Sequence, residues 1–283
     1  MLISETFHWW ALLCAISLLN LLAWSGSAVF FWRQKHVLSP QAWRLIRLQL
    51  LLSAAYVLGC AYRSAFPVFD IQRLCLVDSW LSSVMVGRSV ATVAEVCFAA
   101  QWAAMLQHLA RSHNRPLSAR HAQLIVPMIV VAEICSWHAV LTTSNLGHVV
   151  EETIWGLCVL LLVAHLWALA KDSQSKLQRI LYAGSVVGAA YVVYMFIEDV
   201  PMYWGRWLSD QASGRSYHSL EAGMADAASR WVVSHRWEDW QSEMVWMTLY
   251  FSVAVWLSIA LVHTLALHTR SRARLRLVEA PTA

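Results

Sequence analysis

Charged residues are scarce in this chain. Only 13% of its 283 residues are charged, whereas soluble domains carry about 25%. The hydrophobic share is 59% and the mean hydropathy is +0.50. An ordinary soluble enzyme and a disordered chain are therefore both excluded.

Lysine is rare as well. The 21 basic residues include only three lysines, Lys35, Lys171 and Lys176, and the formal net charge is +4. A nucleic-acid-binding domain concentrates Lys and Arg on one face, so this small and dispersed charge argues against nucleic acid as a partner. The remaining class is a protein that crosses the lipid bilayer several times.

Cysteines are few, and their spacing is not that of a metal site. The chain has six, with no CxxC pair, which excludes zinc-ribbon and iron–sulfur motifs. Five of the six lie within long apolar runs, where cysteine behaves as a small apolar residue. Cys60 and Cys75 lie toward the same side of the membrane, so a disulfide between them is left open.

Seven long apolar runs dominate the chain. A bilayer core about 30 Å thick needs roughly 20 apolar residues per helical span, and each run meets this length. We predict an all-α bundle of seven transmembrane helices, forming a single membrane domain over residues 1–283. The spans are expected at about 8–32, 44–66, 80–110, 121–144, 147–170, 177–203 and 240–268. The first run opens with Glu5 rather than with basic residues, so we interpret it as a retained helix and not as a signal peptide.

The basic residues are distributed unevenly between the loops. Fourteen of the 21 lie in the short loops after spans one, three and five or in the C-terminal tail. Because Lys and Arg are enriched in cytoplasmic loops, we predict an outside N-terminus and a cytoplasmic C-terminus. The high arginine and low lysine content favours a bacterial inner (cytoplasmic) membrane.

Ionisable residues occur inside the predicted spans, where each costs roughly 2.5–3.5 kcal/mol on insertion scales and normally faces a cavity or a partner. In span three, two ionisable residues, Arg88 and Glu95, share one helical face with Thr92, Ala99 and Trp102. Arg88 and Glu95 lie two turns apart, so they either pair directly or share a bridging group. Span four adds Glu133 at mid-depth.

Spans five to seven add further polar stripes. His148 lies three and four residues before Glu151 and Glu152, a pattern typical of metal binding or general-base catalysis. The alternative is that these acids complement the positive end of the helix dipole. The other two stripes are Gly184, Gly188, Tyr191, Met195 and Glu198 in span six, and Asp239, Glu243, Trp246 and Tyr250 in span seven. Together the stripes predict an acid-rich pocket in the outer half of the bundle.

The longest loop is expected on the outer side, at residues 204–239. Leu220, Met224, Ala227 and Trp231 follow one another at helical spacing. They predict an amphipathic helix that lies at the membrane interface or covers the mouth of the bundle as a lid.

Two families of seven-span proteins do not fit the chain. Rhodopsins hold retinal on a lysine in the last span, and this last span has none. Zinc hydrolases of the ceramidase and adiponectin-receptor type carry an HxxxH pair there, whereas His263 and His268 are five residues apart.

Three functions remain open. The first is a metal-dependent membrane enzyme that acts on a lipid or another small molecule taken from the bilayer or the outer side. Its candidate ligands for iron, manganese or zinc are Glu95, Glu133, His148, Glu152, Glu198 and Glu243, and its candidate catalytic groups are Arg88, Glu95, Glu133, His148 and Glu151. The second is a transporter or proton-coupled solute-binding protein. The third is a receptor or assembly factor that uses the outer loop.

Overall fold

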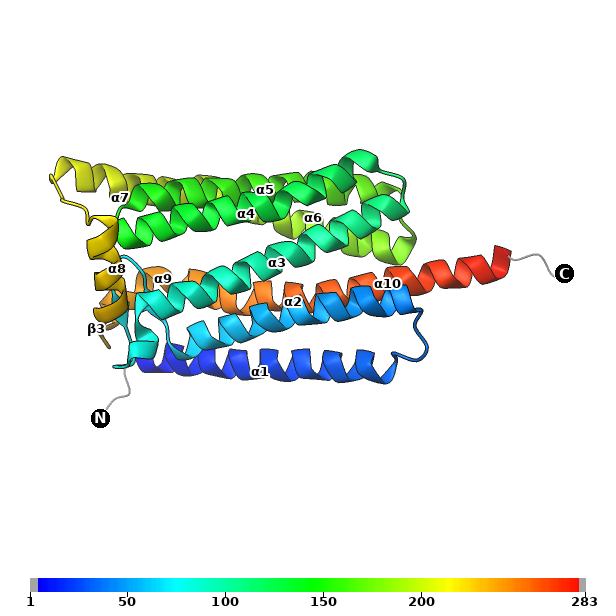
Figure 1. Ribbon diagram of the computed structural model, residues 1–283, viewed down its shortest axis with the longest axis horizontal. Coiled ribbons are helices and arrows are strands. Elements are labelled where there is room, and N and C mark those ends of the chain that lie inside the picture. Colours follow the sequence, from blue (N-terminus) through cyan, green and yellow to red (C-terminus); the bar gives the residue numbers. More distant parts are fainter. Residues whose placement is uncertain (1–4, 280–283) are drawn as a thin grey trace.

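Seven long apolar helices form the body of the protein in a computed structural model that describes residues 5–279 (Figure 1). The first five spans are α1 (Glu5–Arg33), α2 (Pro40–Ala65), α3 (Val84–Ser112), α4 (Pro116–Thr142) and α5 (Asn145–Lys171). The sixth comprises α6 (Ser175–Tyr194), a π-helical turn η2 (Met195–Asp199) and α7 (Val200–Ala212). The seventh comprises α9 (Trp237–Leu249), a π-helical turn η3 (Tyr250–Ala254) and α10 (Val255–Glu279). The predicted all-α bundle of seven spans is confirmed.

The helix ends follow local sequence signals. The side chain of Ser39 caps α2 by accepting from the Ala42 amide, and Pro40 occupies the first helical position. Ser83 caps α3 in the same way. Span three was expected from residue 80, but Trp80–Ser82 forms a separate 3-10 turn (η1), so the helix starts only at Val84.

Consecutive helices from α1 to α5 pack side by side, and α6 packs on α5. The seventh span does not close the ring against the sixth, because α10 packs mainly on α2 and makes few contacts with α6. Glycines permit the closest approaches: a Cβ on Gly59 would lie 2.6 Å from the Ala94 Cβ, and one on Gly147 would lie 2.5 Å from the Cys135 carbonyl oxygen. The sixth and seventh spans pack on each other less closely than the consecutive spans do.

A buried polar network fixes α10 to α2 and α3. Gln101 donates from Nε2 to the Gln49 Oε1 atom at 3.1 Å, and the Ser258 hydroxyl donates to Gln101 Oε1 at 2.5 Å. The Ser258 hydroxyl in turn accepts from the Ser53 hydroxyl, with the two oxygens 2.9 Å apart. Such hydrogen bonds between helices stabilise membrane bundles, in which apolar contacts alone give little specificity.

The two ends of the bundle differ in structure. One end, here called the long-loop end, carries the segments 66–83 and 213–236. They form a small sheet of strands β1 (Val68–Phe69), β2 (Leu74–Cys75) and β3 (Val232–Val233), in that order. The other end, the short-loop end, carries the connections 34–39, 113–115 and 172–174.

Helix α8 (Leu220–Ser229) lies across the long-loop end, against α4 and α3 (Figure 1). The sequence predicted a helix from the apolar spacing that begins at Leu220, and α8 confirms it. Its contact face only partly matches the expected apolar stripe: Ala227 is buried, as is Gly223 outside the stripe, while Leu220 and Met224 are more than half exposed. The contact uses small residues that let the two backbones approach. Its role as a lid stays a prediction.

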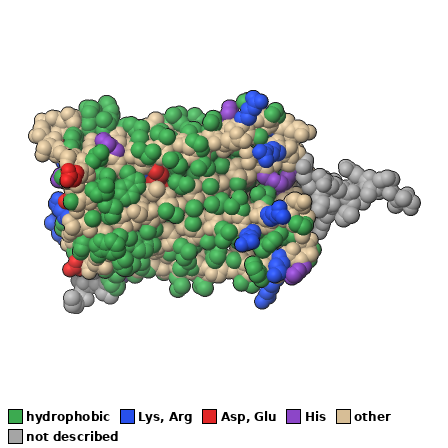
Figure 2. Space-filling model, viewed as in Figure 1, with side chains coloured by type: hydrophobic (Ala, Val, Ile, Leu, Met, Phe, Trp, Pro, Cys, Tyr) green, Lys and Arg blue, Asp and Glu red, His purple; other side chains and the backbone are tan. Residues whose placement is uncertain are grey.

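Basic side chains gather at the short-loop end on the face seen in Figure 2. This distribution agrees with the loop charges from which the orientation was predicted; the orientation itself stays a prediction.

Cys60 and Cys75 are both free and buried. Burial raises the pKa of the Cys75 thiol, which donates to the Val77 carbonyl oxygen at 3.5 Å.

Candidate functional site

One arginine joins three carboxylates that come from three helices. The Nη2 atom of Arg88 on α3 lies 2.7 Å from Glu133 on α4, 3.1 Å from Glu151 on α5 and 3.2 Å from Glu95 on its own helix. Arg88, Glu133 and Glu151 are buried. The predicted pairing of Arg88 with Glu95 is confirmed, and Glu133 and Glu151 converge on the same nitrogen.

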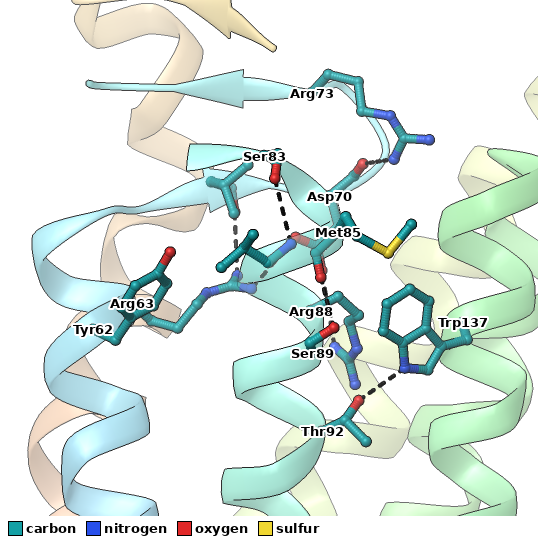
Figure 3. Close-up of polar contacts among 12 residues, drawn as sticks. Tyr62, Arg63, Asp70, Arg73, Ser83, Met85, Arg88, Ser89, Thr92 and Trp137 are labelled. Carbon is teal, nitrogen blue, oxygen red and sulfur yellow. Dashed lines mark hydrogen bonds and ion pairs between the residues drawn. The ribbon is translucent and has the colours of Figure 1, made fainter. Parts of the chain in front are cut away.

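Neighbouring side chains orient these carboxylates. Thr92 donates to Glu133 Oε2 at 2.6 Å and accepts from the Trp137 indole at 3.0 Å, as Figure 3 shows for Thr92 and Trp137. The Tyr250 hydroxyl, in the π-helical turn of the seventh span, donates to Glu95 Oε1 at 3.0 Å. The cluster is thus held by four of the seven spans.

His148 is held by Glu151. Its Nδ1 atom lies 2.7 Å from Glu151 Oε2, and since a carboxylate accepts, Nδ1 carries the hydrogen. The imidazole also packs against the Tyr203 ring, with ring centroids 4.9 Å apart. The expected pairing of this histidine with a flanking acid is confirmed for Glu151.

A loop at the long-loop end adds a fourth acid. Asp70 Oδ2 lies 3.9 Å from Arg88 Nη1, and Asp70 Oδ1 lies 3.5 Å from Arg63. The Asp70 backbone carbonyl accepts from Arg73, and Figure 3 shows this segment next to the start of α3 that carries Arg88. The loop therefore borders the cluster on the side of the long-loop end.

The cluster forms part of the wall of a cavity of about 530 Å³. This volume lies within the range of about 300–1,000 Å³ that is usual for small-molecule sites. Near the long-loop end the lining is charged and includes Asp70, Arg88, Glu95, Glu151 and Glu152. Further along the bundle it is apolar and includes Ile125, Ile129, Leu162, Leu166 and Trp102.

The polar stripe predicted on α3 faces this cavity. Arg88, Glu95, Ala99 and Trp102 all line it, while Thr92 bonds to Glu133 behind it. On span seven, Glu243, Trp246 and Tyr250 line it, but Asp239 instead accepts from the Ser234 hydroxyl at 2.5 Å.

Two predicted ligands lie apart from the carboxylate cluster. Glu243 pairs with Arg206 at 3.4 Å, at the border of the cavity. Glu198 is exposed and is not among the residues that line the cavity, so its assignment to the pocket was wrong. The physical reason is the π-helical turn Met195–Asp199, whose wider winding shifts the helical face by one residue and buries Asp199 instead.

Glu152, Tyr191 and Tyr203 line the cavity as well. Glu152 makes no hydrogen bond and no ion pair with any residue that the structure describes. Its carboxylate is therefore available to a ligand, unlike those of Glu133 and Glu151, which Arg88 engages.

The Glu95, Glu133 and Glu151 carboxylates have the spacing of a cation site. Each offers an oxygen, and these oxygens lie within 4.8 Å of one another. The other oxygen of Glu133, Oε1, is buried and has no hydrogen-bond partner among the described residues, although Glu133 is only 3% exposed. By donor type and spacing, the three carboxyl groups could hold a metal ion.

Sequence reasoning missed several residues of the site. Asp70 lies in a loop without a motif, and Tyr203 and Arg206 lie at and beyond residue 203, the predicted end of span six. The helix continues past this point because Pro201 stands in the first turn of α7, a position that a helix tolerates. The continued amphipathic spacing across 200–212 was the available signal.

Comparison with protein-family models, with curated proteins and with solved structures gives no match to this chain.

Proposed function

We propose that the protein is a metal-dependent membrane enzyme that acts on a lipid or another small molecule bound in the cavity. The observation that carries the proposal is the convergence of Glu95, Glu133 and Glu151 at the cavity wall, with oxygens within 4.8 Å of one another. The unpartnered Oε1 atom of Glu133 supports it independently, because a buried polar atom without a partner carries a free-energy penalty that a ligand removes.

Arg88 and a metal ion would compete for the same carboxylates. The guanidinium nitrogen Nη2 lies among all three, so an ion requires this nitrogen to withdraw. Asp70, 3.9 Å from Nη1, offers the guanidinium an alternative partner. The carboxylate donors favour a hard or borderline ion such as manganese, iron or zinc.

The surrounding groups fit acid–base chemistry. A metal ion at the three carboxylates would supply Lewis-acid activation of a bound oxygen. His148, fixed through Nδ1 by Glu151, would accept or donate a proton at Nε2 on the cavity side. Arg88 would pair with negative charge on the substrate.

Transport across the membrane is the less favoured alternative. A transport path needs polar groups along its length, whereas the cavity wall beyond the cluster consists of residues such as Ile129, Leu162 and Leu166. A pocket that is polar only near one end fits an enzyme or a binding protein better.

The decisive experiment is elemental analysis of protein purified in mild detergent and reloaded in turn with Fe²⁺, Mn²⁺ and Zn²⁺. Wild-type protein should retain one of these ions at near-stoichiometric level through gel filtration. Glu133→Gln and Glu151→Gln should lose it, because each removes one charged ligand.

Glu198→Gln is the matched control, since Glu198 is exposed and lies outside the cavity lining. This variant should keep the metal. Circular dichroism and gel filtration establish that each variant is folded. Wild-type protein that stays metal-free after all three reloadings, while remaining monodisperse, would overturn the proposal.

A further inference from the structure

The cavity extends well beyond the carboxylate cluster into an apolar compartment. Along α5 its lining runs from Glu152 through Trp155 to Leu166. At 1.5 Å per residue, the apolar part between Trp155 and Leu166 is about 16 Å long. An enzyme for a small polar substrate has no use for this depth, whereas a hydrocarbon chain fills it.

The compartment reaches the lipid-facing surface between the sixth and seventh spans. Five residues that line the cavity are themselves exposed: Val187 and Tyr194 on the sixth span, and Val245, Leu249 and Val253 on the seventh. A residue that lines a cavity and is itself exposed marks a place where the cavity opens. Because four of the five are aliphatic, this opening suits a hydrocarbon chain.

The packing of the helices also favours an opening between the sixth and seventh spans. The sixth span packs on α5 and the seventh on α1 and α2, and contacts between α6 and α10 are few. Each of these two spans contains a π-helical turn, η2 and η3, and such turns occur often at functional sites. Side-chain contacts also join the two spans: Tyr194 stacks on Trp246 with centroids 5.8 Å apart, and Arg206 pairs with Glu243.

Polar groups that make no hydrogen bond with the described residues indicate the chemistry of the head group. The Glu152 carboxylate and the Tyr191 and Tyr203 rings line the cavity between the cluster and the apolar compartment. A carboxylate with no partner favours a cation, and phenol hydroxyls donate or accept hydrogen bonds. An ammonium group that also carries hydrogen-bonding substituents satisfies both.

We propose that the cavity binds a membrane amphiphile with one long hydrocarbon chain and an ammonium head group, taken up laterally between the sixth and seventh spans. The head group contacts Glu152, and the chain occupies the compartment lined by Ile125, Ile129 and Leu166. This inference deepens the proposed function, since it names the substrate class of the same site.

Photolabelling in phosphatidylcholine nanodiscs tests chain binding. The probe is dodecylamine with a diazirine at the end of its chain, and labelled residues are identified by mass spectrometry. Labels should fall on Ile125, Ile129 or Leu166, and unlabelled dodecylamine should compete at least tenfold better than dodecanol or dodecyl sulfate. Glu152→Gln should abolish this preference for the amine.

Gly184→Leu tests the compartment. Gly184 lines the cavity, and a Cβ there would meet only the Leu166 Cδ1 atom, at 3.9 Å. The larger leucine fills the compartment, so labelling should fall at least tenfold. Gly26→Leu is the control, because a Cβ on Gly26 has nothing within 4 Å, and it should label like wild type.

A crosslink tests lateral uptake. In a Tyr194→Cys/Trp246→Cys protein, a short bismaleimide should slow dodecylamine uptake at least tenfold, while each single variant treated alike controls for the native cysteines. Unchanged uptake would overturn the lateral route. Labels confined to lipid-facing residues, or unaffected by Gly184→Leu, would overturn the chain site.

Metal content measured on the same samples separates the two proposals. Metal-free protein that still labels in the compartment removes the proposed metal chemistry and keeps the amphiphile site. Metal-loaded protein without compartment labelling removes the amphiphile site and keeps the proposed metal chemistry.

Discussion

The Nη2 atom of Arg88 lies 2.7 Å from Glu133 Oε2 across the contact between α3 and α4. The same nitrogen also contacts Glu95 and Glu151, so one positive charge serves three carboxylates. Arg88 is therefore both a structural link and the group that any added cation must replace. These two roles have opposite consequences when the arginine is removed.

Arg88→Met should lower the free energy of unfolding by about 3–5 kcal/mol, because it leaves buried carboxylates without their counter-charge. Added Mn²⁺ or Zn²⁺ should then raise the thermal midpoint of this variant more than that of wild type, since the ion no longer competes with a guanidinium. The measurement is thermal unfolding in detergent with and without metal. Arg215→Met is the control, because Arg215 is 37% exposed and is not among the residues that line the cavity. A midpoint of Arg88→Met that metal leaves unchanged would contradict metal binding by the cluster.

The ion pair between Arg73 and Asp226 makes the long-loop end sensitive to acid. Arg73 Nε donates to Asp226 Oδ2 at 2.8 Å, and Arg73 is 1% exposed. Burial alone would raise the pKa of Asp226, but the hydrogen bond and charge of Arg73, followed by those of Arg230, hold this pKa below its ordinary value. The stabilisation is therefore fully present above the unfolded pKa, about 3.9, and is lost as the pH falls through the lower, folded pKa.

Asp226→Asn should accordingly destabilise the protein by about 3 kcal/mol at neutral pH, by leaving the Arg73 charge without its partner. The difference from wild type should shrink when thermal midpoints are compared below pH of about 4. Asp210→Asn serves as the control, because its partner Arg215 is 37% exposed and surface pairs contribute only about 0–1 kcal/mol. A difference that stays constant with pH would show that charge is not the cause.

The Gln101 network is expected to hold the seventh span in place. Gln101→Leu removes its hydrogen bonds to Gln49 and Ser258 and leaves buried polar atoms without partners, which costs about 1–3 kcal/mol. Gln123→Leu is the matched control, because Gln123 is exposed on α4. Thermal midpoints in detergent measure both variants. Equal midpoints would indicate that packing against α2 alone positions α10.

Helical periodicity accounts for the part of the site that sequence reasoning found. Arg88 and Glu95 share a face because both lie in an unbroken α-helix, so their pairing follows from their spacing. Glu198 does not obey this rule, since it lies within the π-helical turn Met195–Asp199, whose wider winding brings Asp199 inward instead. The pattern of apolar residues does not predict a π-helical turn.

Contacts that depend on tertiary structure escaped prediction for a different reason. Asp70 reaches Arg88 only because a small sheet folds the 66–83 segment back over α3. On α8, the predicted apolar stripe includes Ala227, which is buried, but it does not include Gly223, which the close approach of two backbones buries as well. In both cases the outcome depends on elements that are distant in the sequence.

That close approach gives a last prediction. A Cβ on Gly223 would lie 1.9 Å from the Leu141 carbonyl oxygen, so Gly223→Ala forces α8 away from α4. Overpacking of this kind costs about 1–3 kcal/mol, and the displacement also strains the Arg73–Asp226 pair, because Asp226 lies on α8. Limited proteolysis should cut the 213–219 connection at least several times faster in the variant.

Gly205→Ala provides the contrast: nothing lies within 4 Å of its Cβ, and alanine favours a helix by up to about 1 kcal/mol over glycine. Equal cleavage rates for Gly223→Ala and wild type would mean that α8 is not held by its contact with α4.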